Sequence, residues 1–308
     1  MEKTRVNFGA TCRDTFHAKF DVTTVGSITI DQIILVDKLP KRHFEATIRS
    51  ARSDCWGGRA PNVAVMLSKL GFRTAIISPV GGDFDHTGYL THLNSLQVDI
   101  HGLRVFPHEK TMRTVIITAS DGAQITLIEL GAASHFSEIL MPEDIIRESS
   151  IVHISSSGSA KSNIDAAQLA KRSHAMVSFD VGNDPCTGSA DYLEDMIRNT
   201  DLLFLNDVEM KSIRKRLQID SSEGLLKLGP SVVNVIRKED KSSTIYTMNE
   251  TEEIPSFYGS YVDPTGTSDA YVAGFLAGYL RQYPISKCGL LGAAEASFVV
   301  ETIGSQTN

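Results

Sequence analysis

A turn of small residues leading into an apolar helix is the part of this chain best suited to chemistry. Residues 263–275 read Asp-Pro-Thr-Gly-Thr-Ser-Asp-Ala-Tyr-Val-Ala-Gly-Phe, which places Asp269 in the first turn of the predicted helix. Backbone N–H groups at a helix start can hold a phosphate and stabilise charge that develops on it. A carboxylate beside them can take a proton from an attacking hydroxyl. Read from the residues alone, an acidic residue at this position is more often a helix cap.

Small or polar residues also end four of the predicted strands. They are Gly26, Ser155, Asp180 and Asn206. In open parallel sheets the ligand crevice lies at the carboxyl ends of the strands. One such residue would decide little, because any strand must end in something polar, but four together favour a binding site.

Short apolar runs alternate with helix-like stretches along most of the chain. The runs are 22–25, 74–80, 151–155, 176–180, 202–206 and 232–236, and the helical stretches include 62–70, 163–174 and 208–217. Nearly continuous apolarity is typical of strands that are buried on both faces. The alternation predicts a three-layer α/β/α fold with a doubly wound, mostly parallel sheet.

Two segments, about 33–55 and 103–130, interrupt this rhythm with alternating apolar and polar residues. A turn is expected at Asp121-Gly122, between two strand-like runs. We expect these segments to form a small β-sheet lid over one edge of the core. Its open strand edges could pair with a second subunit, which makes a homodimer through the lid an expectation.

The composition excludes several classes of protein. The 308 residues are 42% hydrophobic and 22% charged, with a formal net charge of −7. The absence of a long Lys/Arg tract argues against a nucleic-acid partner. No apolar run reaches about 18 residues, so no membrane span is expected. The four cysteines are far apart and suggest neither disulfides nor zinc, and a cytoplasmic location is the expectation.

Two segments resemble the signatures of a known family. Residues 57–65, Gly-Gly-Arg-Ala-Pro-Asn-Val-Ala-Val, and residues 263–275 are similar to the first and second signatures of the ribokinase-like (PfkB) carbohydrate kinases. The similarity runs in order from about residue 21 to the end of the chain. It implies a ribokinase-like kinase domain over 21–308, with residues 1–20 as an N-terminal extension that has no assigned role.

The resemblance implies a catalytic role for the second signature. Asp269 would be the general base that deprotonates the acceptor hydroxyl. Gly266, Thr267 and Ser268 would complete the anion hole at the helix start. The family usually has Gly-Ala-Gly-Asp here, so Ser268 stands in place of a glycine.

The resemblance also implies which residues bind the acceptor. Residues 26–31 are similar to the family's opening Gly-x-x-x-x-Asp, whose aspartate binds substrate hydroxyls and corresponds to Asp31. In the first signature, Gly57, Gly58 and Asn62 would contact the sugar-like substrate. Glycines there let the backbone approach a ligand closely.

A third set of residues is implied for ATP and its ions. Asn206 and Glu209 match a family Asn-x-x-Glu motif that helps to place Mg²⁺ and the triphosphate. Glu209 would act on the metal ion indirectly. Without the resemblance, the motif would indicate only a helix cap. Thr265 and Arg237 are candidate phosphate contacts, although Arg237 fits a solvated turn better. Asp263 is the candidate site of a monovalent cation such as K⁺.

These features predict an ATP-dependent kinase acting on a hydroxyl of a small sugar-like metabolite, with a sugar or sugar acid as the first choice of acceptor. A nucleoside kinase of the same family is the second choice. A catalytically silent ligand-binding relative is a third, because residues 236–241 lack the two glycines that usually line the nucleotide. A nicotinamide dehydrogenase is excluded, since Gly26 is not part of a Gly-x-Gly-x-x-Gly opening a helix.

Overall fold

The computed structural model describes residues 18–156, 159–182, 188–236, 242–257 and 262–306. Most of the N-terminal extension and the candidate phosphate contact Arg237 therefore lie outside the described residues.

Among the described residues, nine strands form the main sheet, in the order β13-β12-β11-β10-β9-β8-β1-β4-β5. They are β1 Phe20–Val25, β4 Thr74–Gly81, β5 Asp99–Phe106, β8 Ser149–Ser155, β9 Met176–Asp180, β10 Leu202–Asn206, β11 Val232–Ile236, β12 Ser243–Thr247 and β13 Thr251–Ile254. The strands from β5 through β11 pair in parallel, and β12 and β13 continue antiparallel. All six predicted strands are confirmed, since each of the six apolar runs falls within a strand of this sheet.

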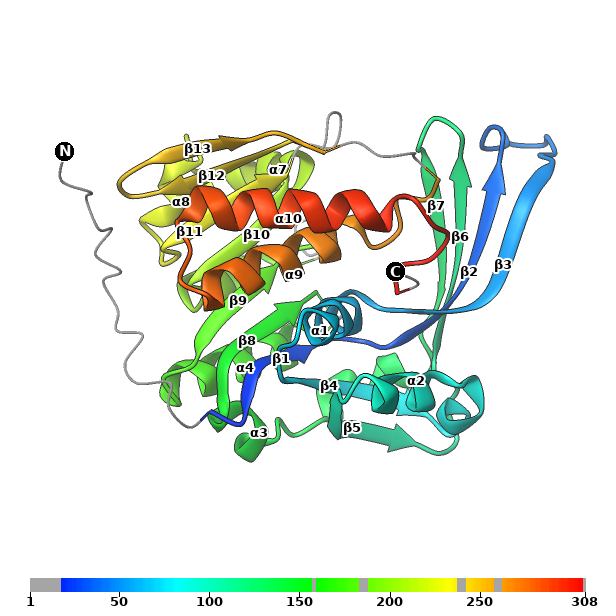
Figure 1. Cartoon of the computed structure of the whole chain (residues 1–308), viewed down its shortest axis with the longest axis horizontal. Coiled ribbons are helices and arrows are strands. Elements are labelled where there is room, and N and C mark those ends of the chain that lie inside the picture. The colour runs from blue at the N-terminus through cyan, green and yellow to red at the C-terminus, as the bar shows by residue number, and fades with distance from the viewer. Residues whose placement is uncertain (1–17, 157–158, 183–187, 237–241, 258–261, 307–308) are drawn as a thin grey trace.

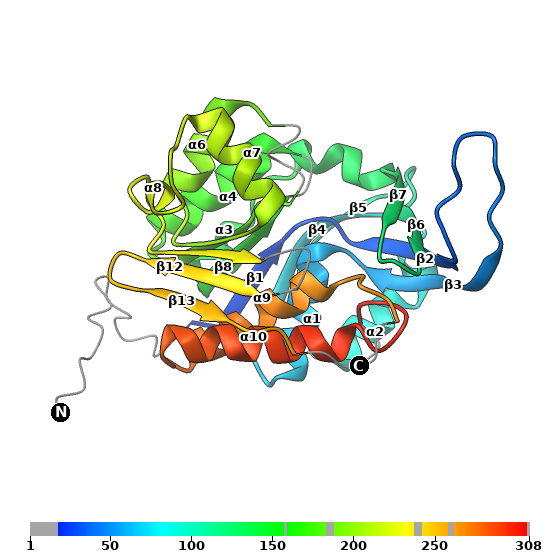
Figure 2. The same ribbon diagram turned by 90° about the horizontal axis from the view of Figure 1, so that it is seen from above.

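Helices cover both faces of the sheet (Figure 2). One layer holds α1 Arg59–Lys69, α2 Tyr89–Ser95, α9 Thr267–Leu280 and α10 Ile285–Val299. The other holds α3 Glu143–Arg147, α4 Ala160–Arg172, α6 Ala190–Arg198, α7 Asp207–Leu217 and α8 Glu223–Leu226. Two short 3₁₀ helices, Phe84–Thr87 and Gly131–Glu138, join neighbouring elements. The fold is the predicted ribokinase-like three-layer α/β/α architecture.

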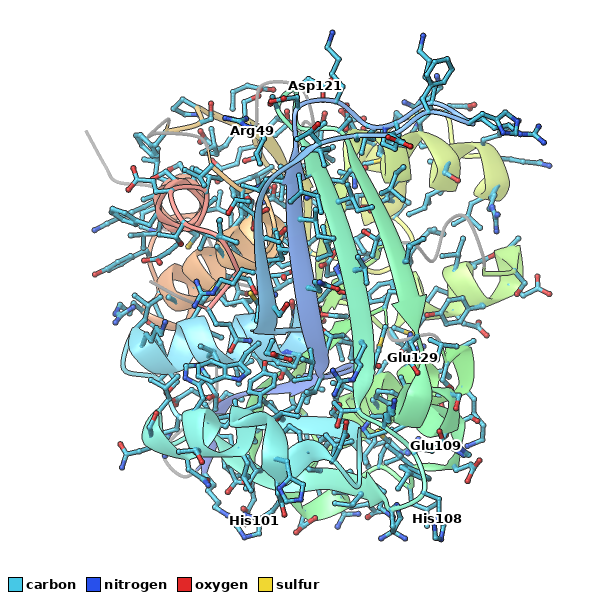
Figure 3. All side chains as sticks on the ribbon, turned by 90° about the vertical axis from the view of Figure 1, so that its right-hand side faces the viewer. Arg49, His101, His108, Glu109, Asp121 and Glu129 are labelled. Atoms are coloured by element: carbon cyan, nitrogen blue, oxygen red, sulfur yellow. The ribbon has the colours of Figure 1, made fainter. Side chains whose placement is uncertain are left out.

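The lid is a second, four-stranded sheet in the described part of the chain, ordered β3-β2-β6-β7. Its strands are β2 Thr29–Val36, β3 Ile48–Gly57, β6 Met112–Ala119 and β7 Gln124–Glu129. Two antiparallel hairpins, β2–β3 and β6–β7, meet through a parallel β2–β6 pairing. Figure 3 views this sheet from outside, with Asp121 at the β6–β7 turn and Glu129 at the far end of β7.

The second lid segment is shorter than the sequence suggested. Residues 103–106 belong to β5 in the main sheet, and the lid strands resume only at Met112. β5 is an edge strand whose side chains are mostly half-buried or exposed. A half-exposed edge strand has the same alternating pattern as a lid strand, so the pattern alone could not separate them.

The strand order reverses direction beside β1. From β1 the chain goes to β4 on one side, and it later returns to β8 on the other. Gly26 follows β1, and a Cβ at this position would lie 2.7 Å from Cβ of Ala60 in α1. The carboxyl ends of parallel strands at such a switch point are where open α/β sheets bind ligands.

None of the helices in the described ranges is long and apolar enough to cross a membrane. Of the cysteines in those ranges, Cys55 and Cys288 are buried and free.

Candidate active site

Asp269 lies in the first turn of α9 and is buried. The helix starts after Gly266, whose φ of 83° is in the left-handed region. A Cβ at Gly266 would also lie 2.3 Å from Cβ of Ser305. Both the backbone conformation and the crowding therefore require glycine at this turn.

Two backbone N–H groups at the start of α9 are available to an anion. The N–H groups of Ser268 and Asp269 have no acceptor among the described residues, as expected for the first turn of a helix. Thr267 differs from the expectation, because its N–H and its hydroxyl both donate to the carbonyl of Pro264, at 3.1 and 2.6 Å. The N–H groups of 268 and 269 are therefore the ones that could bind an anion here, while the Thr267 N–H is already used within the turn.

The pKa of the Asp269 carboxyl lies near neutral pH. Burial raises its pKa to about 7, and the nearby carboxylates of Asp180 and Asp31 act in the same direction. The Arg59 guanidinium and a hydrogen bond from Asn62 oppose the rise in pKa. A pKa near the working pH is optimal for a general base, because the group is both available and basic enough.

The same shift makes a prediction about stability. Because the folded state holds the Asp269 proton up to about pH 7 and the unfolded chain releases it near pH 4, stability falls as pH rises between these values. Asp269→Asn removes this cost, and we expect it to stabilise the protein above pH 7 by on the order of 3 kcal/mol. Chemical denaturation of both proteins at pH 5 and pH 8 measures the difference.

A matched control is Asp85→Asn, since Asp85 is an exposed carboxylate in the first 3₁₀ helix. It should leave the free energy of unfolding unchanged at both pH values. A gain for Asp269→Asn that is equal at pH 5 and pH 8 would contradict the raised pKa of Asp269.

Arg59 is a site residue that the sequence analysis did not select. It is the first residue of α1, directly after Gly58, and one guanidinium nitrogen lies 3.0 and 3.3 Å from the two carboxylate oxygens of Asp180. Its Nε lies 3.9 Å from Oδ1 of Asp269. The only sequence signal was a charged residue between the paired glycines and Asn62.

The residues that the resemblance assigns to acceptor binding, Asp31, Gly57 and Gly58, lie together. Gly57 and Thr29 are register partners, and a Cβ at Gly57 would lie 1.9 Å from Oδ2 of Asp31. Thr114 of β6 donates to the other Asp31 oxygen at 2.7 Å. Burial raises the pKa of Asp31, and the hydrogen bonds from Thr114 and Thr29 oppose this rise. Gly58 has a φ of 105°, and a Cβ there would lie 2.2 Å from a backbone oxygen, so this loop also requires glycine.

Asn62 connects α1 to Asp269 and to the last described residues of the chain. It is buried in α1, and its Nδ2 donates to Oδ2 of Asp269 at 2.7 Å. Its Oδ1 accepts hydrogen bonds from Ser305 and Gln306, both at 2.8 Å. The structure thus places Asn62 beside the candidate base, with one amide hydrogen left for another acceptor.

The Asn206–Glu209 motif forms the capping box that its residues alone predict. Oδ1 of Asn206 accepts from the N–H groups of 208 and 209, and Oε2 of Glu209 accepts from the Asn206 N–H at 2.8 Å. Both residues lie at the carboxyl end of β10, next to the end of β9 and on the same edge of the sheet as Asp180. In the described residues, no group of three or more His, Cys, Asp or Glu could hold a metal ion by itself.

Asp263 and Thr265 form a buried turn before α9. Oδ1 of Asp263 accepts from the N–H and the hydroxyl of Thr265, at 3.1 and 2.7 Å, and Oδ2 accepts from the Gly304 N–H at 3.0 Å. These three hydrogen bonds satisfy the Asp263 carboxylate and allow it to be buried. Its role as a ligand of a monovalent cation, and that of Thr265 as a phosphate contact, stay predictions.

The family model of the pfkB family carbohydrate kinases matches residues 19–308. This chain is a member of the PfkB carbohydrate kinase family. The identity of the family makes the protein a phosphotransferase with an alcohol group as acceptor.

Individual relatives of this PfkB kinase match it over most of their length. A nucleoside kinase of Methanocaldococcus jannaschii is 38% identical over 93% of this chain and 92% of its own. Its crystal structure superposes with a TM-score of 0.84 over 94% of this chain and 95% of that one. A nucleoside kinase of Methanothermobacter thermautotrophicus is 35% identical over 94% of this chain and 92% of its own.

A more distant structure shares the fold. The ribokinase of Arabidopsis thaliana, solved with ribose and ATP, is 23% identical, and it superposes on this PfkB kinase with a TM-score of 0.76 over 92% of this chain and 94% of its own.

Proposed function

We propose that this PfkB kinase transfers the γ-phosphoryl group of ATP to a hydroxyl of a nucleoside, with Asp269 as the general base. The observation that carries the proposal is the environment of Asp269. This buried carboxyl has a pKa of about 7, is hydrogen-bonded by Asn62, and adjoins two N–H groups that have no acceptor among the described residues. A proton acceptor beside an anion site is what phosphoryl transfer to a hydroxyl needs.

In the proposed reaction, Asp269 takes the proton of the acceptor hydroxyl while the hydroxyl oxygen bonds to the γ-phosphorus. The bond between that phosphorus and the bridging oxygen of ATP breaks, and ADP leaves with the electron pair. The N–H groups of Ser268 and Asp269 donate to the oxygens of the transferred group. Mg²⁺ on the triphosphate would neutralise part of its charge, and Asn206 and Glu209 are the residues proposed to place it.

The acceptor is held by the first signature in this proposal. The Asp31 carboxylate, packed on Gly57, can accept hydrogen bonds from sugar hydroxyls, and Gly58 brings the backbone close to the ligand. Lid closure would exclude water and limit hydrolysis of ATP.

The nucleoside is preferred as acceptor because of the similarity to two archaeal nucleoside kinases, at 38% and 35% identity over nine-tenths of each chain. A free sugar or sugar acid, the first choice from the sequence, is supported only by the family. The sugar-binding residues themselves do not separate the two, because a nucleoside carries the same ribose hydroxyls.

The test is ADP release from ATP–Mg²⁺ with purine and pyrimidine nucleosides, free sugars, sugar acids and phosphosugars as acceptors. We expect turnover with nucleosides and none with free ribose. Turnover with free sugars alone would overturn the nucleoside proposal. Thermal stabilisation by ATP and a nucleoside, without ADP release from any acceptor, would identify a catalytically silent relative.

We further propose that a second copy of this chain covers the lid. β7 is an edge strand that is exposed throughout, and Leu127 and Ile128 expose 57% and 52% of their surface. An exposed apolar edge strand is a ready pairing site. We expect a dimer in sedimentation and a shift to monomer in Leu127→Glu; an unchanged sedimentation coefficient would contradict this interface.

A further inference from the structure

Residues 303–306, after α10, enter the candidate active site. Figure 1 shows this part of the chain turning back from the end of α10 toward α1 and the lid. Arg52 of β3 donates to the carbonyl of Ile303 at 3.0 Å, and the Gly304 N–H donates to Asp263. Ser305 and Gln306 are buried, with 4% and 5% of their surface exposed. We call residues 303–306 the return segment.

The return segment controls which way the Asn62 amide faces. Ser305 Oγ and Gln306 Nε2 both donate to Asn62 Oδ1 at 2.8 Å. An amide whose oxygen is held by two donors must direct its nitrogen to the opposite side, where Nδ2 donates to Asp269 at 2.7 Å. Flipping the amide would set its NH₂ group against the Gln306 donor and its oxygen against the Asp269 carboxylate, so these two hydrogen bonds would be lost. Only the contact with the Ser305 hydroxyl, which can accept as well as donate, could survive.

Gln306 is itself held in place. Its Nε2 also donates to the hydroxyl of Tyr89 at 2.5 Å, and that hydroxyl donates to the Gly57 carbonyl at 3.0 Å. Lys69 donates to the backbone carbonyl of Gln306 at 3.0 Å. The return segment therefore binds Asn62 directly, and it also binds Lys69 and Tyr89, whose hydroxyl contacts Gly57.

We propose that Ser305 and Gln306 are positioning residues for the base: they fix the Asn62 amide so that its N–H points at Asp269. The proposal rests on the proposed role of Asp269 as the general base. Without the two donors the amide turns freely, and in one of its orientations its oxygen faces the carboxylate. The aspartate is then less stabilised as an anion and less firmly aimed at the acceptor hydroxyl.

The consequence is a change in the pH dependence of catalysis. The Asn62 hydrogen bond lowers the pKa of Asp269, so its loss raises that pKa and leaves less of the base deprotonated at neutral pH. The charged and titratable groups around Asp269 are Arg59, Asp180 and Asp31, and those around Gln306 are Lys69, Tyr89 and His92. None of them is changed in the variants below.

The experiment compares Ser305→Ala, Gln306→Met and the double variant, with kcat/KM for the acceptor measured from pH 5.5 to 9. Methionine keeps the length of glutamine and removes its donor. In the double variant we expect the acidic limb of this profile, the fall in rate toward low pH, to move up by about one pH unit. The rate at pH 7 should then fall about fivefold, because less of Asp269 is deprotonated. Each single variant should show a smaller but measurable shift, of about 0.3 pH unit, because the remaining donor still holds the same oxygen.

Arg52→Met is the matched control, because it releases the return segment at Ile303 without touching Asn62. It should leave the acidic limb in place. An unmoved acidic limb in the double variant would overturn the proposal. If the KM for the acceptor were also lower, the return segment would instead obstruct the acceptor. If the double variant does not fold, an acidic limb that is unmoved in both single variants would overturn the proposal, because each of them removes one of the two donors.

Asp269→Asn, measured alongside, separates the two proposals. Loss of activity in Asp269→Asn together with an unmoved limb in the double variant refutes only the positioning role. Activity retained in Asp269→Asn refutes the base itself, and the positioning proposal with it.

Discussion

Asp269→Asn is expected to lower kcat about 10³-fold, while the KM for ATP changes little. Asparagine is nearly the same size and can still accept the Asn62 hydrogen bond, so the site should keep its geometry. What it loses is the ability to take the acceptor proton, and general-base catalysis contributes about 10²- to 10⁴-fold. Steady-state ADP release at saturating acceptor measures the effect.

The pH profile provides a second signature of the same change. Because Asp269 must be deprotonated to act and its pKa is about 7, kcat/KM of the unmodified protein should fall tenfold per pH unit below that value. The residual activity of Asp269→Asn should lack this limb. Asp85→Asn removes an exposed carboxylate from the first 3₁₀ helix, and its kcat should match that of the unmodified protein within about threefold. Surface substitutions usually change free energies by no more than about 0.5 kcal/mol. A similar loss in both variants would contradict the assignment of the base.

Arg59→Met is expected to lower kcat about 10²-fold and to move the acidic limb to higher pH. The guanidinium lies between the carboxylates of Asp180 and Asp269, and after burial it is the largest influence on the Asp269 pKa, which it lowers. We propose that it also neutralises charge on the transferred phosphoryl group, for which losses of about 10²- to 10³-fold are typical when one stabilising donor is removed. The measurement is kcat against pH at saturating ATP.

Two further variants test whether charge or placement matters. Arg59→Lys keeps the positive charge and should retain most of the pH limb, but a lysine has one nitrogen and cannot face Asp180 and Asp269 with two separate nitrogens, as the guanidinium does. Gly182→Ala leaves Arg59 intact and displaces it, because a Cβ at Gly182, where φ is 56°, would lie 1.7 Å from a guanidinium nitrogen. It should reproduce part of the Arg59→Met defect. Full activity in both Arg59→Met and Gly182→Ala would refute the role of Arg59.

The local features of the fold were predictable from the sequence. The buried parallel strands have continuous apolar runs, and the capping box at Asn206 follows from its Asn-x-x-Glu spacing. Each depends on residues a few positions apart. The lid boundary at β5 was placed wrongly, because an edge strand of the main sheet and a strand of the lid expose their side chains in the same way.

The chemistry of the site depended on contacts between distant residues. Asn62 and Asp269 are 207 positions apart, Arg59 meets Asp180 across 121, and Gln306 reaches Asn62 across 244. The sequence determined that Asp269 stands at a helix start beside glycine. The tertiary structure decided that this carboxyl is buried, that its pKa is near 7, and that Arg59 and Asn62 lie beside it, with the return segment bonded to Asn62. The reason is physical: a pKa and a hydrogen bond depend on the atoms that packing brings within a few ångströms, and sequence periodicity records only which face of an element is buried.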